Sequence, residues 1–557
     1  MKRQLTYMIL TIFSILLIGC GGGGDGDGGG TPTEDDSSAS SSKIINITED
    51  YQVESLGKNG AIHTNIKLGN TPKNLYVLLS NYNKSKTSHP SISHNAKIIP
   101  FSKSTKSLSQ FTTSVQPRIL HAPEHITRFN RDRSKLQKTT HTKKSKLLAA
   151  EVKHYKDVAG DTKVFYTTAD KSSQTSATVR KVVSDVSTIF GNKTLNIWVS
   201  DDSFGSGCTK TKCVTQEMVD TLADTFLKTG SNNDIYDWVT NIYGKEWSSD
   251  AQTKYSNLIS ANDEITILLT DIDNDNSKNG GVIGYFYGKD NYDTSTYEGS
   301  NQRVMFYIDS VMFANTDSGD TWQKEIYSTL AHEFVHMLEF YQKFVMKDTE
   351  HDIWIAEMLA ETTEDLVATK IKHKGPRNVV YTDGSAGEAN NVNGRYPLFN
   401  QDNTLSLTTW NNTMADYSKV SAFGTFLTRN YGGAKVLHDI MHNTKEHEDA
   451  VELAAGKSFD TLLREWGIAI MFSDIESPED LPTYNTGDFT SNSYKSSIYQ
   501  LGSINFFNYI PKPITKSTTG AVKAQGNYYY KIGDGLTGDI TIDLTLDSNT
   551  EATLIVK

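Results

Sequence analysis

Two histidines that stand four residues apart carry the clearest chemistry in the chain. His332 and His336 enclose Glu333 in the pattern H-E-x-x-H. On a helix this spacing places both imidazoles on one face, one turn apart, where they can bind a single zinc ion. A glutamate beside the first histidine can reach a water molecule at the metal and act as a general base. The pattern therefore predicts a catalytic zinc centre with Glu333 as its base.

A third ligand must come from elsewhere, because catalytic zinc takes three protein ligands and keeps one open position. Glu357 is the candidate, three residues after Trp354. Glu361 lies one turn beyond it on the same helical face, where it can hold a ligand histidine by its second nitrogen. The alternative is that Glu357, Glu361 and Glu364 form a solvated helix face, with the two histidines as a satisfied core pair.

Both stretches are predicted to be helices that position these groups. Residues 326–344 contain no Gly or Pro, and their apolar side chains recur at helical spacing. Residues 354–368 consist largely of good helix formers such as Ala, Leu, Met and Glu. A polar connection, residues 346–352, separates them. Two helices joined in this way can pack antiparallel and direct Glu357 at the histidine pair.

The combination resembles the hyicolysin-type zinc metallopeptidases, a glutamate-zincin family with H-E-x-x-H and a later W-x-x-E-x-x-x-E. Met358 departs from the family, which more often has glycine there. The likeness covers roughly residues 150–470. Other segments similar to the family's occur in its order: Leu195 to Val199, Asn241 to Trp247 and Gly284 to Asp290.

This resemblance implies a zincin-like α+β metallopeptidase domain, a Zn²⁺ cofactor, and protein or peptide substrates. Tyr417 lies in a stretch similar to the family's and is the candidate for stabilising the oxyanion. In zincins a strand shortly before the zinc helix forms the edge of the cleft and pairs with extended substrate. Residues 304–308, apolar and β-rich, are expected to be that strand.

The N-terminus predicts export and lipid anchoring. Residues 1–19 read as a signal peptide that ends in Leu17 to Cys20, a sequence that resembles a bacterial lipobox. Cys20 would then carry diacylglycerol, and residues 20–43, rich in Gly, Ser and Asp, would form a flexible tether. Gly21 differs from the aspartate that retains lipoproteins in the inner membrane of some bacteria, which allows an outer-membrane or cell-surface location. The alternative is a simple secretory signal with an incidental cysteine.

The net charge excludes one class of partner. It is −11 for the whole chain and −13 once Lys2 and Arg3 leave with the signal peptide (−11 − 2). This balance argues against nucleic acid. With Cys20 lipidated, Cys208 and Cys213 remain, and in an oxidising compartment we expect them to close a small disulfide loop.

Asp271, Asp273 and Asp275 alternate in a polar stretch that suits Ca²⁺. Asp and Asn are also common turn formers, and the spacing is not that of an EF-hand. We therefore keep two alternatives for this loop: it binds calcium, or it is an ordinary turn.

The amino-acid composition divides the rest of the chain into four regions. Residues 44–82 read as a β region, 83–150 as a basic linker or propeptide-like segment, 151–484 as the metallopeptidase domain and 485–557 as a C-terminal β domain that can share a sheet with residues 44–82. Within the peptidase domain, residues 177–190 are expected to be helical. The predicted fold class is α+β, with small β-rich regions flanking the peptidase domain.

Three functions fit these residues. The leading hypothesis is a zinc endopeptidase acting outside the cytoplasm. The second is a non-catalytic surface lipoprotein, an adhesin or binding module with structural zinc, although structure alone needs no base at Glu333. The third is a zinc hydrolase for a substrate other than a peptide.

Overall fold

The computed structural model describes residues 42–97, 122–140, 156–230, 234–260, 263–317, 321–373, 375–377, 395–476, 478–484, 491–495, 497–506 and 511–557. The predicted signal peptide, Cys20 and all but the last two residues of the predicted tether lie outside them. Among the described residues, no helix combines the length and apolar character that crossing a membrane requires.

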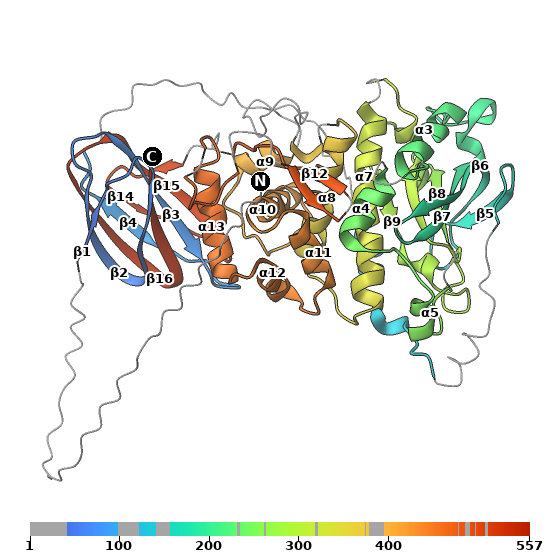
Figure 1. Ribbon diagram of the computed structural model, residues 1–557, viewed down its shortest axis with the longest axis horizontal. Coiled ribbons are helices and arrows are strands. Elements are labelled where there is room, and N and C mark those ends of the chain that lie inside the picture. Colours follow the sequence, from blue (N-terminus) through green and yellow to red (C-terminus); the bar gives the residue numbers. More distant parts are fainter. Residues whose placement is uncertain are drawn as a thin grey trace, which may run out of the picture. The chain divides into compact units, whose positions relative to one another are not determined.

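A mixed sheet forms the framework of the peptidase region (Figure 1). In spatial order its strands are β5 (Thr162–Tyr166), β6 (Gln174–Thr188), β7 (Gly191–Ser200), β8 (Glu264–Thr270), β10 (Met305–Asp309) and β9 (Gly284–Phe286). Strands β7, β8 and β10 run parallel, and β9 is antiparallel to β10. Of the described strands in this sheet, β9 therefore forms one edge, nearest the helix that carries His332 and His336.

Two expectations about these strands are wrong. The segment expected to be helical, residues 177–190, falls mostly in strand β6. It is dense in Val and Thr, whose branched side chains suit a pleated surface, and hairpin partners on both sides supply its hydrogen bonds. Residues 304–308 do not form the cleft edge either, because β10 is covered on one side by β8 and on the other by β9. The edge position belongs to β9.

Helices cover the sheet and build the region beyond it. They are α1 (Glu124–Asn130), α3 (Gln216–Phe226), α4 (Ile235–Tyr243), α5 (Asp250–Lys254), α6 (Ser310–Phe313), α7 (Thr321–Glu339), α8 (Ile353–Lys370), α9 (Arg395–Gln401), α10 (Met414–Asn430), α11 (Ala434–His442), α12 (His447–Ala455) and α13 (Phe459–Met471). Helix α7 continues into a π-helical stretch, Phe340–Val345, and α8 packs against α7. Both helices were predicted from the sequence, close to these bounds.

A second sheet joins the two ends of the described chain. Its path is β1 (Lys43–Asn46), β2 (Gln52–Lys67), β16 (Asp539–Val556), β3 (Lys73–Asn81), β15 (Gly526–Leu536) and β13 (Lys512–Pro513), and β4 (Ser91–His94) pairs with both β14 (Ser517–Thr519) and β16. The predicted linker thus begins with a strand, since β4 belongs to this sheet. Strands β11 (Ser491–Tyr494) and β12 (Ser497–Gln500) pair with each other as a separate hairpin. The α+β class with β-rich terminal regions is confirmed, whereas the exact domain boundaries stay predictions.

Candidate active site

Aromatic packing sets the orientation of α7. Phe334, in the middle of H-E-x-x-H, is fully buried, and its ring lies 5.6 Å from that of Phe306 on β10 and 5.6 Å from that of Phe226 on α3. Because one face of the helix is fixed on the sheet, His332 and His336 are presented from another face, one turn apart.

Three ligand atoms meet at one point between α7 and α8. Nε2 of His332 lies 3.2 Å from Nε2 of His336. Oε2 of Glu357 lies 3.2 Å from the first of these nitrogens and 3.5 Å from the second. The side chains are 1%, 18% and 7% exposed in the order His332, His336 and Glu357. The cluster is thus nearly closed, with access on the His336 side.

These distances and donor types fit zinc. A tetrahedral ion with bonds of about 2.0–2.1 Å holds its ligand atoms about 3.3 Å apart, and two imidazoles with one carboxylate leave the fourth position open. Among the described residues, the groups of acidic, histidine and cysteine side chains close enough to share an ion are this one and its neighbour, His332 with Glu361 and Glu364.

Glu333 is held by the edge strand. Its Oε2 accepts a 3.1 Å hydrogen bond from the backbone N–H of Phe286 on β9. Its Oε1 is buried and has no hydrogen-bond partner within the described part of the chain. Burial raises the pKa of this carboxyl, although both histidines oppose the shift. A carboxylate with one fixed oxygen and one uncommitted oxygen has the arrangement that a general base needs.

The charges of the cluster complement one another. Burial acts to lower the pKa of His332, but the carboxylates of Glu357 and Glu364 outweigh it and raise the pKa to about 9. Burial likewise acts to raise the pKa of Glu357, but the two histidines hold it well below its usual range. The carboxylates thus favour positive charge at this point, as a metal site does.

Sequence reasoning missed two carboxylates that lie near the second nitrogens of the histidines. Oε2 of Glu364 lies 3.5 Å from Nδ1 of His332, and its Oε1 accepts a hydrogen bond from Ser328. Oε2 of Glu339 lies 3.9 Å from Nδ1 of His336, and its Oε1 is 3.0 Å from Nδ1 of His351. The available signal was helical spacing, since Glu339 follows His336 by three residues and Glu364 follows Glu357 by two turns.

Glu361, predicted to hold a ligand histidine by its second nitrogen, is hydrogen-bonded to Arg395. Arg395 donates hydrogen bonds of 3.0–3.1 Å from its Nε and Nη2 to the carboxylate of Glu361. Burial raises the pKa of Glu361 to about 7, against the effect of Arg395. A carboxylate oxygen of Glu361 still lies within 4.8 Å of the nearest His332 nitrogen. Its part in orienting that histidine stays a prediction.

The comparisons with known proteins agree with this geometry. Residues 170–447, about half of the chain, match the model of the peptidase M30 family, and this span includes all three ligand candidates and Glu333. The chain belongs to the peptidase M30 family. It is also 24% identical over 355 residues to the neutral metalloprotease ShpI of Staphylococcus hyicus, an alignment that covers 62% of this chain and 68% of the relative. The predicted hyicolysin-like family is thereby confirmed, and with it membership of a family of metal-dependent peptide hydrolases.

In this M30 peptidase, Met358 is accommodated by a glycine on the neighbouring helix. A Cβ atom on Gly424 of α10 would lie 3.0 Å from Cγ of Met358 and 1.9 Å from Oγ1 of Thr362. Gly424 therefore allows α10 to approach α8 closely where Met358 replaces the family's more usual glycine. This contact supports the segment of α8 that carries Glu357.

Tyr417, the predicted oxyanion stabiliser, lies on α10 near the cluster. It is buried, its hydroxyl donates to Oδ1 of Asn412 at 3.1 Å, and Arg395 lies 5.8 Å from its ring centre. Burial first, then the carboxylates of Glu357 and Glu361, raise the pKa of Tyr417 above its usual range, so the hydroxyl keeps its proton. Its action on a reacting substrate stays a prediction.

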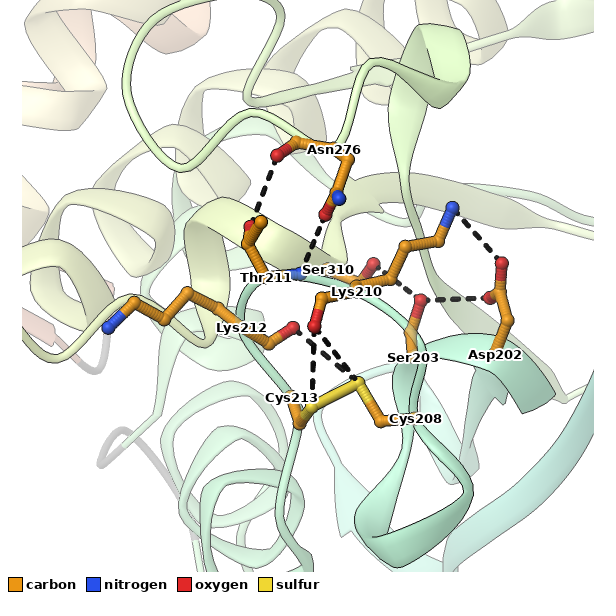
Figure 2. Close-up of a disulfide and its surroundings, with 9 residues drawn as sticks. All are labelled: Asp202, Ser203, Cys208, Lys210, Thr211, Lys212, Cys213, Asn276 and Ser310. Carbon is orange, nitrogen blue, oxygen red and sulfur yellow. Dashed lines mark hydrogen bonds and ion pairs between the residues drawn. A yellow bond between two sulfur atoms is a disulfide. The ribbon is translucent and has the colours of Figure 1, made fainter.

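The disulfide loop, Cys208 to Cys213, contacts the loop that was expected to bind calcium (Figure 2). Cys208 and Cys213 are joined by a disulfide, and Lys210 within their loop lies 2.7 Å from the carboxylate of Asp271 and 2.8 Å from Oδ1 of Asn274. Asp271, Asp273 and Asp275 do not converge into a metal-binding group in the described structure. Calcium finds no support here, because the ammonium of Lys210 already balances the most buried of these carboxylates.

Proposed function

We propose that the chain is a zinc-dependent endopeptidase, with His332, His336 and Glu357 as metal ligands and Glu333 as general base. The observation that carries this proposal is the convergence of Glu357 on the two histidines, beside a Glu333 carboxylate that β9 holds by one oxygen. Purely structural zinc requires no uncommitted base. The membership of a peptidase family supports the same choice over a non-peptide substrate.

Each residue of the site would have its own role in peptide hydrolysis. A bound zinc ion supplies Lewis acidity, which polarises the peptide carbonyl and lowers the pKa of water. The Phe286 N–H fixes one oxygen of Glu333, so that its other oxygen can take a proton from the attacking water and return it to the leaving amine. The carboxylates of Glu364 and Glu339 lie 3.5 and 3.9 Å from the second nitrogens of His332 and His336, where their negative charge would favour this orientation of the rings.

A chelation experiment tests this proposal. Purified protein should contain about one zinc ion per chain, and it should cleave unfolded casein. Chelator should abolish cleavage and added Zn²⁺ should restore it. A protein that binds zinc and stays folded but cleaves no casein under any of these conditions would instead support the binding-module hypothesis.

We further propose that the enzyme acts outside the cytoplasm, anchored in the cell envelope by a lipid on Cys20. The motif at Leu17 to Cys20 and the tether composition support this. Cys20→Ser should move the protein from the detergent phase to the aqueous phase. Unchanged partitioning, with no added mass on Cys20 of the native protein, would remove the anchor from the proposal.

A further inference from the structure

One segment of the predicted basic linker enters the cleft beside the metal-ligand cluster. The cavity there is lined by Phe286, Glu333, His336 and Glu357, and on its other side by residues of a short stretch that precedes the peptidase sheet in the chain. The contributing residues of this stretch are Ala122, Thr127, Asn130 and Arg131. We call residues 122–135 the cleft segment. Its position raises the question of what it covers.

Asn130 covers the exposed edge of β9. Its Nδ2 donates to the carbonyl of Phe286 at 2.9 Å, and its Oδ1 accepts from the N–H of Gly288 at 2.7 Å. A side-chain amide offers the same donor and acceptor as a peptide group, so Asn130 makes the pair of bonds that an added strand would make. The Phe286 N–H is bound to Glu333. An extended substrate would therefore compete with Asn130 for this edge.

Arg131 lines the cavity, and Arg133 lies two residues further along the cleft segment. Arg131 donates to the carbonyl of His351, and its Nη2 lies 3.9 Å from Oε2 of Glu350. Arg133 donates to the carbonyl of Thr349 at 2.7 Å, and its guanidinium lies 4.2 Å from the ring centre of Phe344. This subsite consists of carbonyl oxygens, a carboxylate and an aromatic ring, which together bind a guanidinium.

Apolar contacts hold the cleft segment in place. Ile126 is 2% exposed and joins the apolar cluster on the sheet face opposite α7. The ring of Phe129 lies 4.9 Å from that of Tyr287 and 4.7 Å from that of Tyr297. The segment is thus anchored on the peptidase domain itself, with Arg128 projecting to solvent at 75% side-chain exposure.

We propose that the cleft segment occupies the substrate cleft in place of a basic peptide, and that it lowers the activity of the peptidase until it is displaced. The inference rests on the proposed peptidase function. It also identifies a substrate class, because the subsite that holds Arg131 and Arg133 is suited to peptides with arginine at the corresponding position. Lys143, Lys144 and Lys146 follow in the sequence, where a trypsin-like protease could cut.

The first test uses the full-length chain with the double substitution Asn130→Ala and Arg131→Ala. Removing the hydrogen bonds to Phe286 on β9 and to Gly288, together with a charged one to His351, should raise kcat/KM on casein by at least ~10-fold. Arg128→Ala is the matched control, since Arg128 lies on the same helix but pairs only with exposed Glu124; its activity should equal that of the wild type. Metal content and thermal unfolding of each variant are measured alongside.

The second test adds a synthetic peptide of residues 122–135. It should inhibit the double variant in competition with casein, and the same peptide with Arg131→Gln should inhibit at least ~10-fold more weakly. A fluorescent form of the peptide should bind the double variant even after chelation. Because this binding requires no catalysis, it tests occupancy of the cleft independently of the proposed peptidase activity.

Two results would overturn the inference. One is a folded, metal-loaded double variant that cleaves casein measurably but no faster than the wild type does. The other is a peptide that neither binds nor competes, which would make the segment a permanent wall of the cleft. If the double variant does not fold, the single variant Arg131→Gln replaces it in both tests. Loss of casein cleavage in every preparation, with peptide binding intact, would refute the proposed peptidase function alone.

Discussion

The backbone N–H of Phe286 donates a 3.1 Å hydrogen bond to Oε2 of Glu333. This contact joins the edge strand of the sheet to the proposed general base. A peptide added to the edge of β9 would lie beside the remaining oxygen of Glu333, which is buried and makes no hydrogen bond among the described residues. Under the proposed function, substrate alignment and proton transfer would both depend on this short strand.

The first prediction concerns this base. Glu333→Gln should keep the fold and the zinc content, because the amide replaces the carboxylate without loss of volume. Turnover should fall at least ~100-fold, since the amide cannot accept the proton. Casein cleavage and metal analysis of the same preparation check this. Near-normal proteolysis by a zinc-loaded variant would contradict the assigned role.

The second prediction ranks the acidic residues by zinc affinity. Glu357→Ala should lose zinc most strongly because it removes a ligand. Glu364→Ala and Glu339→Ala should each weaken binding ~10–100-fold, as is typical for groups that hold ligand histidines. Glu361→Ala should lower zinc affinity less than Glu364→Ala does, because the Glu361 carboxylate is already hydrogen-bonded to Arg395.

Titration against a competing chelator measures this order. Glu298→Ala serves as the control, since its side chain is 79% exposed and pairs only with Lys171. Wild-type affinity in Glu357→Ala would refute the ligand set. A larger loss from Glu361→Ala than from Glu364→Ala would restore the orienting role that the sequence predicted for Glu361.

The third prediction concerns Tyr417. If its hydroxyl stabilises the oxyanion, Tyr417→Phe should lower kcat by ~10–1,000-fold and leave KM and zinc affinity nearly unchanged. If the hydroxyl only bonds Asn412, Asn412→Ala should reproduce the effect of Tyr417→Phe. Steady-state kinetics on a fluorogenic peptide separate the two cases.

The fourth prediction concerns the contact between α8 and α10. Gly424→Ala should destabilise the protein by about 1–3 kcal/mol, because the new methyl group overlaps Oγ1 of Thr362. Adding Thr362→Ala should recover part of this loss. Gly207→Ala is the control, since a Cβ there meets no described atom within 4 Å. Denaturant unfolding measures all variants, and equal stability of Gly424→Ala and wild type would contradict the predicted overlap.

The fifth prediction concerns the disulfide loop. Replacing Cys208 and Cys213 by alanine should lower the free energy of unfolding by about 2 kcal/mol, which is the entropy expected for so short a loop. Lys210→Met should also destabilise the protein, because it leaves the buried carboxylate of Asp271 without its ammonium partner. Added Ca²⁺ should not raise the thermal midpoint of the wild type. A clear calcium-dependent rise would restore the calcium expectation at this loop.

Local patterns in the sequence were sufficient to predict the centre of the site. The spacing of His332 and His336 has a direct meaning because the helical repeat is a property of the backbone alone. Residues 326–344 were predicted as a helix by the same periodicity, and residues 354–368 by their helix-forming composition. The count of ligands that catalytic zinc needs called for a third ligand, and the Trp354 context that resembles the family's pattern pointed to Glu357. A β region at residues 485–557 was also predicted, and its strand β16 alternates buried and more exposed side chains over residues 540–546, as a half-buried strand requires.

The tertiary structure decided every assignment that depends on contacts between distant segments. Periodicity alone places Glu361 and Glu364 on one face, but the packing of Arg395 against Glu361 and of His332 against Glu364 gives them different partners. The order of β8, β10 and β9 likewise follows from pairing rather than from local composition, which is why residues 304–308 were mistaken for the edge. The entry of Asn130 into the cleft joins residues more than 150 positions apart. Such contacts depend on how packed elements bury their surfaces together, and no local stretch of sequence contains that information.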